Sequence, residues 1–262
     1  VEVVSEFELK AVLECGVPAS EVLVNGPAKH AWLPRHAVPG LRVNFDSLSE
    51  VHVLAPMAAK LRWSVGLRLN TSSEVSFEHP GVRTQFGLLA TEMPRALTAL
   101  RRAGVPAEVL HFHLRTNVQE ARCYREAAVE ALAVAESAGW RPRVLDLGGG
   151  FPPERVMTRK GAPLDAGISL ASLREAVTSI RSRHRYVEEV WMENGRWLTA
   201  SMGVLAVRVL DVKEGRGLRT LVCDGGRTLQ AMVATWERHG LFPLARRRGP
   251  RVRTLVCGPT ST

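Results

Sequence analysis

The stretch that decides the fold is VLDLGGGFPP, from Val144 to Pro153. A short apolar run ends at Asp146 and Leu147, breaks into three consecutive glycines and stops at two prolines. This pattern predicts a buried strand that runs into a loop of bare backbone. Glycines lack a Cβ, so successive N–H groups can turn toward one point and form a concave anion site that suits a phosphate. A flexible glycine-rich turn is the alternative for an isolated GGG, so the surrounding segments must decide.

Strand-like and helix-like segments alternate on both sides of this stretch. Helix starts are indicated by the capping-box spacings of Ser5 with Glu8 and Ser47 with Glu50, and by a near-match of Asn117 with Glu120. The alternation requires a parallel sheet with helical crossovers. Seven strands are expected, at residues 1–4, 21–24, 41–45, 62–69, 109–114, 144–147 and 186–193.

Seven such units are one short of a (β/α)8 barrel, in which functional residues lie at the carboxyl ends of the strands. Polar and glycine-containing segments follow nearly every strand, which favours a barrel over a doubly wound open sheet. The expected α/β fold is therefore a TIM barrel lacking its first strand, over residues 1–195. Residues 196–262 alternate in a β-rich pattern, interrupted by a helix expected at 228–239, and are expected to begin a C-terminal β domain that is also incomplete.

The composition is that of an ordinary globular protein, with 45% hydrophobic and 23% charged residues and a net charge of +9. No apolar run reaches ~18 residues and no signal peptide is recognisable, so no membrane segment is expected. The arginine cluster at 246–253 lacks interleaved aromatics, which favours a solvated loop over nucleic-acid binding. Four dispersed cysteines without a CxxC pair indicate reduced thiols and a cytoplasmic location: Cys15, Cys123, Cys223 and Cys257.

Polar side chains follow three of the expected strands. His113 and Thr116 follow one, the glycine loop follows the next, and Glu193 and Arg196 follow the last of the series. Such a set offers a glycine loop and an arginine to a phosphate, an imidazole to a ring face and a carboxylate to a ring nitrogen. Pyridoxal phosphate needs these groups.

Two other ligands are considered for the same residues. His111 and His113 form an H-x-H pattern, expected on one face of a strand, which is also typical of metal sites. Only Asp146 stands at a comparable strand end and the glycine loop would have no role, so no metal is expected. A nucleotide site is disfavoured because GxGxxG is absent and prolines, not a helix, close the loop.

At these residues the sequence resembles the fold-type III pyridoxal-phosphate decarboxylases, which include ornithine, arginine and diaminopimelate decarboxylases and are related to alanine racemase. The motifs occur in the family's order along essentially the whole chain, and together they are specific where each alone is weak. They are VVSEFEL (3–9), NGPAK (25–29), FDS (45–47), LRLN (67–70), HFHLRT (111–116), LDLGGGFP (145–152), ENGR (193–196), CDGG (223–226) and CGPTS (257–261).

The resemblance implies a role for each matching residue. The glycines and Arg196 would bind the cofactor phosphate with Thr116, where the family more often has serine. His113 would stack on the ring and Glu193 would hydrogen-bond its nitrogen, while Arg68 and Glu2 would lie nearby. The expected cofactor-binding residues are Glu2, Arg68, His113, Thr116, Gly148, Gly149, Gly150, Glu193, Gly195 and Arg196.

Glu193 also bears on the type of reaction. A carboxylate keeps the ring nitrogen protonated, so the ring accepts the electron pair left when a Cα bond breaks. The related racemases place an arginine there. Decarboxylation of an amino acid is therefore expected, with a racemase or epimerase, or a non-catalytic decarboxylase-like binding protein, as alternatives.

Three departures from the family bear on the chemistry. The Schiff-base lysine would lie upstream of Val1 and is not in this chain, and neither Lys10 nor Lys29 stands in its place. Ser261 and Thr262 stand where the family has cysteine and an acidic residue, and Asn194 replaces a proline. Ser261 would act as a proton donor across a dimer interface and, with Thr262, would contact the substrate.

These departures shape the remaining expectations. The substrate is expected to be a modified amino acid of a biosynthetic pathway, such as a carrier-linked or citrate-linked one, because distal-amine recognition is lost at 261 and 262. The resemblance implies a homodimer with shared active sites. The catalytic residues within the chain are then His113, Glu193 and Ser261.

Overall fold

The computed structural model describes residues 1–72, 84–153, 167–200, 202–215, 217–226, 229, 240–244 and 252–260. The chain divides into two compact units. One comprises Val1–Pro152 with Ala166–Gly195, and the other comprises Pro153–Asp165 with Arg196–Thr262. The helix expected at 228–239 falls outside the described residues except for Leu229, and so does most of the arginine cluster at 246–253.

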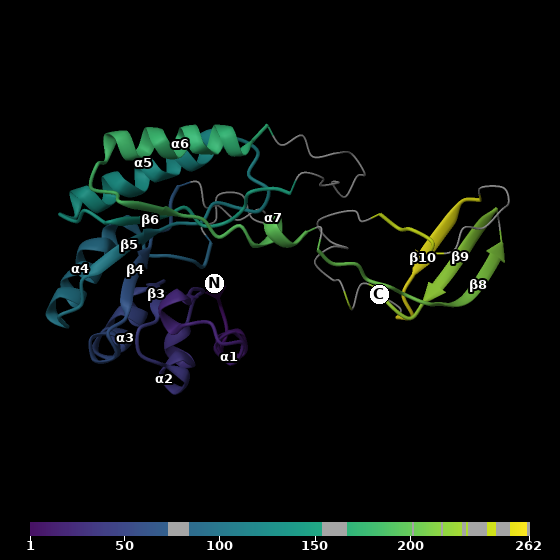
Figure 1. The fold of residues 1–262 in the computed structure, drawn as a ribbon, viewed down its shortest axis with the longest axis horizontal. Coiled ribbons are helices and arrows are strands. Elements are labelled where there is room, and N and C mark those ends of the chain that lie inside the picture. The colour runs from purple at the N-terminus through teal and green to yellow at the C-terminus, as the bar shows by residue number, and fades with distance from the viewer. Residues whose placement is uncertain are drawn as a thin grey trace. The chain divides into compact units, whose positions relative to one another are not determined.

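The first unit holds a seven-stranded sheet whose strands are parallel and follow the chain in order. The seven strands predicted from the sequence are all present, and the sheet is curled as in part of a barrel (Figure 1). They are β1 (Glu2–Val3), β2 (Leu23–Val24), β3 (Arg42–Phe45), β4 (Ser64–Arg68), β5 (Ala107–His111), β6 (Val144–Asp146) and β7 (Glu189–Trp191).

Helices connect successive strands and lie on the outside of the curl, where α5 and α6 run side by side (Figure 1). The α-helices of this unit are α1 (Glu6–Glu14), α2 (Leu33–His36), α3 (Leu48–Leu61), α4 (Met93–Arg102), α5 (Ala121–Ser137) and α6 (Leu170–Arg183). Short 3-10 segments occur at Ala19–Glu21, Lys29–Ala31 and Ala90–Glu92. This arrangement confirms the predicted α/β class with helical crossovers.

Serine caps explain the starts of α1, α3 and α6. The hydroxyl groups of Ser5, Ser47 and Ser169 each accept a hydrogen bond from a backbone N–H in the first turn of the helix that follows. The start predicted at Asn117 is wrong, because α5 begins at Ala121. Asn117 adopts a positive φ of 56°, and the next residue, Val118, donates its N–H to the carbonyl of Gly150 at 2.8 Å. This long-range bond holds the segment out of the helix.

The core lies between the sheet and the helices. Strand residues such as Val43, Leu67 and Leu110 are completely buried, and α5 packs alanines including Ala127 and Ala131 on the sheet. Strands covered on both faces read as continuous apolar runs, which is how they were recognised in the sequence. Small residues on α5 let the helix approach the sheet closely.

One irregularity sets the alignment of the strand ends. The ladder between β4 and β5 passes from Val65 opposite Ala107 to Gly66 opposite Val109, so Glu108 is left without a strand partner. Beyond this bulge, Arg68 lies opposite His111, and His111 lies opposite Asp146. Three polar residues that end three strands therefore form one row.

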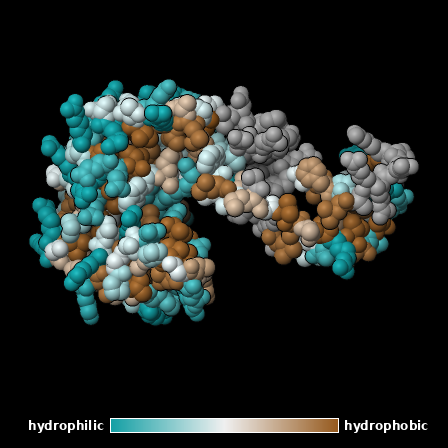
Figure 2. Space-filling model, in the orientation of Figure 1, coloured by the Kyte–Doolittle hydropathy of each residue, from teal (hydrophilic) through white to brown (hydrophobic). Residues whose placement is uncertain are grey.

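The second unit contains a three-stranded sheet of order β10-β9-β8, with β8 (Val209–Gly215), β9 (Leu218–Cys223) and β10 (Thr254–Cys257). The β8 strand is antiparallel to β9, and β9 is parallel to β10. Hydrophobic side chains are exposed on this sheet (Figure 2), among them Leu210, Val212 and Leu255. The β-rich texture is confirmed, but the strand-like alternation predicted from 196 onward is not, because α7 occupies Gly195–Thr199.

None of the described helices is both long and apolar enough to cross a membrane. All four cysteines are free thiols in the structure.

Candidate active site

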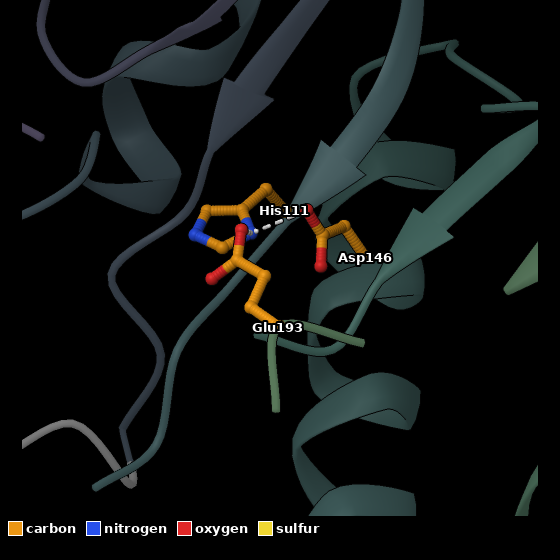
Figure 3. Close-up of side chains that lie close together, drawn as sticks. All are labelled: His111, Asp146 and Glu193. Carbon is orange, nitrogen blue, oxygen red and sulfur yellow. Dashed lines mark ion pairs between the residues drawn. The ribbon is translucent and has the colours of Figure 1, made fainter. Parts of the chain in front are cut away.

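The candidate site lies at the carboxyl ends of the strands, where the bulge aligns the polar residues. Figure 3 shows His111 and Asp146 at the ends of β5 and β6, with Glu193 reaching toward them from the segment after β7. The predicted one-face pairing of His111 with His113 on a strand is wrong, because β5 ends at His111. His113 belongs to the loop that follows.

Glu193 is held from two sides. Its side chain is 7% exposed, and Oε1 accepts a hydrogen bond of 2.5 Å from Nδ2 of Asn25 while lying 3.7 Å from Nδ1 of His111. The same Asn25 nitrogen donates to Oε1 of Glu2 at 3.0 Å. Burial, followed by the charges of Asp146 and Glu2, raises the pKa of Glu193 well above its ordinary value. The site therefore favours the protonated form of this carboxyl group.

Asp146 has the opposite tendency. Its side chain is fully buried, Oδ2 lies 3.1 Å from Nδ1 of the equally buried His111, and Oδ1 accepts the N–H of Gly148 at 3.0 Å. Burial alone would raise the pKa of Asp146. The charge of His111, the hydrogen bond from His111 and the hydrogen bond from the Gly148 N–H outweigh burial, so the pKa of Asp146 is lowered. Two neighbouring carboxyl groups are thus driven in opposite directions.

The glycine loop packs tightly against the segments that follow β5 and β7. An added Cβ would lie 2.7 Å from the carbonyl oxygen of Phe112 at Gly148, 2.5 Å from that of Glu193 at Gly149 and 2.1 Å from that of Arg115 at Gly150. Gly148 and Gly150 also adopt positive φ angles of 67° and 94°. Only glycine fits these three positions without moving backbone.

Hydrogen bonds clamp the same loop. The buried Tyr124 on α5 donates its hydroxyl to the carbonyl of Gly149 at 2.8 Å, and the N–H of Glu193 donates to the carbonyl of Gly148 at 3.0 Å. The N–H groups of Gly148 and Gly149 point to Asp146 and His113, not to one common point as expected. Asp146 at the end of β6 and His113 in the loop after β5 accept these two N–H groups, which were expected to face a phosphate.

His113 is partly exposed, with 34% of its side chain accessible. Nδ1 accepts the N–H of Gly149 at 3.2 Å and lies 4.0 Å from Oε2 of Glu193. Burial, and then the charges of Arg68 and His111, lower the pKa of His113 to about 4. The imidazole is therefore neutral at neutral pH and carries its proton on Nε2.

Arg68, the member of the row that ends β4, also belongs to a second charged cluster. Its Nη1 lies 3.8 Å from Oδ1 of Asp46, and its guanidinium sits 4.5 Å above the ring of Phe86. In the same cluster, Nζ of the buried Lys29 lies 2.7 Å from Oε2 of Glu50 and also donates a hydrogen bond to the carbonyl of Gly26. Burial lowers the pKa of Lys29 despite this partner.

The remaining predicted residues are not among those that form the contacts above. Thr116 is exposed in the loop after β5. Gly195 ends the first unit, and Arg196 begins the following segment of the second unit, where burial lowers its pKa. Ser261 and Thr262 lie outside the described residues.

Sequence reasoning missed two residues that shape the site. In the sequence Asn25 is only part of the NGPAK motif. In the structure its side chain bridges Glu2 on β1 and Glu193 after β7, a contact between distant segments that no local pattern reveals. Tyr124 reads as a core residue of an amphipathic helix, and only the fold shows that its hydroxyl reaches Gly149.

A metal ion is an alternative occupant of this site, because His111, Asp146 and Glu193 each offer a ligand atom within 4.8 Å of the others. Glu193 adds a third possible ligand to the histidine and the aspartate. However, Oε1 of Glu193 already faces an amide N–H of Asn25, whose hydrogen carries positive charge. We therefore do not identify these residues as metal ligands.

Comparison with known proteins shows the family. The profile described as pyridoxal-dependent decarboxylase, pyridoxal binding domain, matches residues 1–200. The chain is 29% identical over 246 residues to diaminopimelate decarboxylase of Deinococcus radiodurans, covering 93% of this chain and 60% of that protein. It is 28% identical over 217 residues to lysine/ornithine decarboxylase of Selenomonas ruminantium, covering 81% of this chain and 52% of that one.

Solved structures agree on the fold. Diaminopimelate decarboxylase from Helicobacter pylori, complexed with L-lysine, superimposes with a TM-score of 0.77 at 19% identity, over 100% of this chain and 66% of that one. The chain belongs to the pyridoxal-dependent decarboxylases. It spans about 60% of the length of the diaminopimelate decarboxylases it matches.

Membership in this family confirms pyridoxal phosphate as the cofactor predicted from the sequence. The described residues fit it. A neutral imidazole at His113 suits contact with a ring face, and a buried carboxyl group at Glu193 suits a ring nitrogen with which it shares a proton.

Proposed function

We propose that the protein catalyses the pyridoxal-phosphate-dependent decarboxylation of an amino acid or an amino-acid derivative. The observation that carries this proposal is the buried carboxyl group of Glu193, set among Asn25, His111 and His113 at the strand ends. An acidic partner keeps a ring nitrogen protonated, which decarboxylation needs more than racemisation does. The decarboxylase names of the relatives support the same activity.

Bound pyridoxal phosphate supplies the electron sink that receives the electron pair of the broken Cα–carboxylate bond. Glu193 holds the proton at the ring nitrogen. His113 covers one face of the ring and excludes water there, and its neutral state leaves the charge balance to Glu193. Gly195, Arg196 and Thr116 bind the phosphate where it lies against the glycine loop, although Asp146 and His113 engage the N–H groups of Gly148 and Gly149. Glu2 and Arg68 lie beside the cofactor.

The same proposal covers the remaining features. The barrel part comprises residues 1–195 and the β domain 196–262, and no lysine of this sequence stands in the place of the one that binds the cofactor covalently. Ser261 and Thr262 contact a modified substrate of a biosynthetic pathway, either free or linked to a carrier. The protein works in the cytoplasm as a homodimer with shared active sites.

The first test is an absorption spectrum of the purified protein with pyridoxal phosphate, before and after borohydride, together with its intact mass. A visible band that borohydride removes, on a protein heavier than 28.8 kDa, supports a lysine outside this sequence. The absence of a band in a protein of that mass would contradict catalysis by the chain alone.

A substrate screen then identifies the reaction. Release of carbon dioxide from an amino acid, with one solvent deuterium incorporated at Cα, is the expected result. Exchange of the Cα hydrogen without carbon dioxide release would favour the racemase alternative. Fastest turnover of a plain diamino acid would overturn the modified substrate but not the decarboxylation.

A further inference from the structure

His111 stands between two buried carboxyl groups. Its Nδ1 lies 3.1 Å from Oδ2 of Asp146 and 3.7 Å from Oε1 of Glu193 (Figure 3). An imidazole that carries two protons compensates only one carboxylate, and a second ionised carboxylate in the same water-poor site is strongly unfavourable. The two carboxyl groups therefore compete for a single positive charge.

The structure gives Asp146 the advantage in this competition. Its Oδ1 is fixed by the N–H of Gly148 at 3.0 Å, which leaves Oδ2 directed at His111. Glu193 is farther from His111, and its Oε1 must share the Asn25 amide with the carboxylate of Glu2. Asp146 is thus preorganised as an anion, whereas Glu193 is not.

We propose that Asp146 is a positioning residue that keeps His111 paired with itself, so that Glu193 retains its proton in the cofactor-free protein and stays available to a ring nitrogen. The charged and titratable groups that face Glu193 are Asp146, which also shares a side-chain hydrogen bond with it, Glu2, His111 and His113, while Arg68 acts on Glu2 and His113. Nδ1 of His111 lies within 4 Å of both carboxyl groups. The opposite pKa shifts of Asp146 and Glu193 support this division of charge.

Removing Asp146 and removing His111 should change the protonation of Glu193 in opposite directions. In Asp146→Asn, Glu193 loses the neighbouring charge and the hydrogen bond that raise its pKa, and His111 loses its partner and turns to Glu193, which then gives up its proton. In His111→Asn, the nearest cation is gone and Glu193 holds its proton more firmly. Loss of packing alone would move both variants in the same direction.

The experiment is infrared spectroscopy of the cofactor-free full chain at neutral pH, reading the carbonyl stretch of protonated carboxyl groups. Glu193→Gln assigns the band. We expect the band in the unmodified protein, its loss in D146N, its retention in H111N and its return in the D146N/H111N double variant. Thermal unfolding of every variant reports whether it is folded.

The proposal is overturned if the band persists in D146N or disappears in H111N. If D146N does not fold, a pH titration of H111N decides, because the band must persist to higher pH than in the unmodified protein, and titration at lower pH would contradict the proposal. Stoichiometric zinc binding that H111N abolishes would also overturn it, since the three residues would then be ligands.

This inference rests on the proposed function only for the identity of the ring that Glu193 meets. The infrared band belongs to the protein without cofactor, so failure to decarboxylate any substrate would not change it. Binding of pyridoxine 5′-phosphate, which needs no lysine, adds a second readout. We expect it to weaken about tenfold or more in D146N, a change of roughly 1.4 kcal/mol.

Discussion

The backbone N–H of Gly149 donates a hydrogen bond to Nδ1 of His113 across 3.2 Å. The glycine loop after β6 and the imidazole after β5 therefore fix each other. Because Nδ1 accepts, the ring proton lies on Nε2 and the imidazole is neutral. The loop that is expected to hold a phosphate thus also sets the protonation of the ring that is expected to cover the cofactor.

The first prediction concerns the pH dependence of stability. The pKa of His113 falls from 6.5 to about 4 on folding, so the unfolded chain binds more protons between these two values. Stability should therefore decrease as the pH falls from 6.5 to 4, and His113→Gln should flatten this decrease. Urea unfolding at a series of pH values measures it. His52→Gln, an exposed histidine on α3, is the control, and an equal slope in H113Q would contradict the prediction.

The second prediction separates steric clash from backbone strain in the glycine loop. Gly150→Ala should destabilise the protein by more than about 2 kcal/mol and abolish cofactor binding, because its Cβ would meet the Arg115 carbonyl at a positive φ. Gly104→Ala has a similar positive φ of 72° in open space and should cost only about 1 kcal/mol. Gly149→Ala, which clashes without a positive φ, should fall between them. Thermal unfolding and pyridoxal phosphate titration give the order, and equal losses in G150A and G104A would rule out the clash.

The third prediction tests the clamp from α5. Tyr124→Phe leaves the buried carbonyl of Gly149 without its 2.8 Å partner, which should cost about 1–3 kcal/mol and weaken pyridoxal phosphate binding. The protein has only one other tyrosine, Tyr186, whose hydroxyl bonds to Glu136 at the surface. Tyr186→Phe should leave cofactor binding unchanged. Equal affinities of the two variants, measured by fluorescence titration, would show that the clamp has no influence.

The fourth prediction concerns the buried ion pair. Lys29→Met leaves Glu50 charged and unpaired in the core, which should cost about 3–5 kcal/mol. Adding Glu50→Gln should recover part of this loss, because the amide oxygen still accepts a hydrogen bond from the backbone of Lys29 or Asp46. Lys10→Met, at an exposed pair with Glu14, should change stability by less than about 1 kcal/mol. Urea unfolding compares the three, and a similar cost for K29M and K10M would refute the importance of burial.

The fifth prediction addresses the reaction. Glu193→Gln removes the acid that shares a proton with the ring nitrogen, so turnover should fall roughly 10²–10⁴-fold. Cofactor affinity should change far less, since the glycine loop and Arg196 are expected to hold the phosphate. Steady-state carbon dioxide release and an absorbance titration measure the two effects separately. A comparable loss of affinity and turnover would assign Glu193 to binding alone.

Much of the fold could be predicted from local sequence. Strands covered on both faces are continuous apolar runs, and Ser5 and Ser47 mark helix starts through bonds three residues long. The start at Asn117 could not be placed, because Val118 is held by Gly150, which is distant in the sequence. Residue types at the strand ends suggested the candidate site, but the partner of each side chain depends on the strand alignment. The Asn25 bridge and the competition of Asp146 with Glu193 for His111 required the structure.

Glu108, which the ladder between β4 and β5 skips, shifts the register of the two strands by one residue. Val65 enters the ladder opposite Ala107, and the omission of Glu108 brings Arg68 opposite His111. Uninterrupted counting from the same start would put Leu110 there, and the alternation of faces along a strand would separate the arginine from the histidine. The arrangement of charges thus depends on how many residues precede His111 as much as on their identity. Deleting Val109 beyond the bulge would leave each reactive group in the chain but bring His111 opposite Leu67 in place of Arg68.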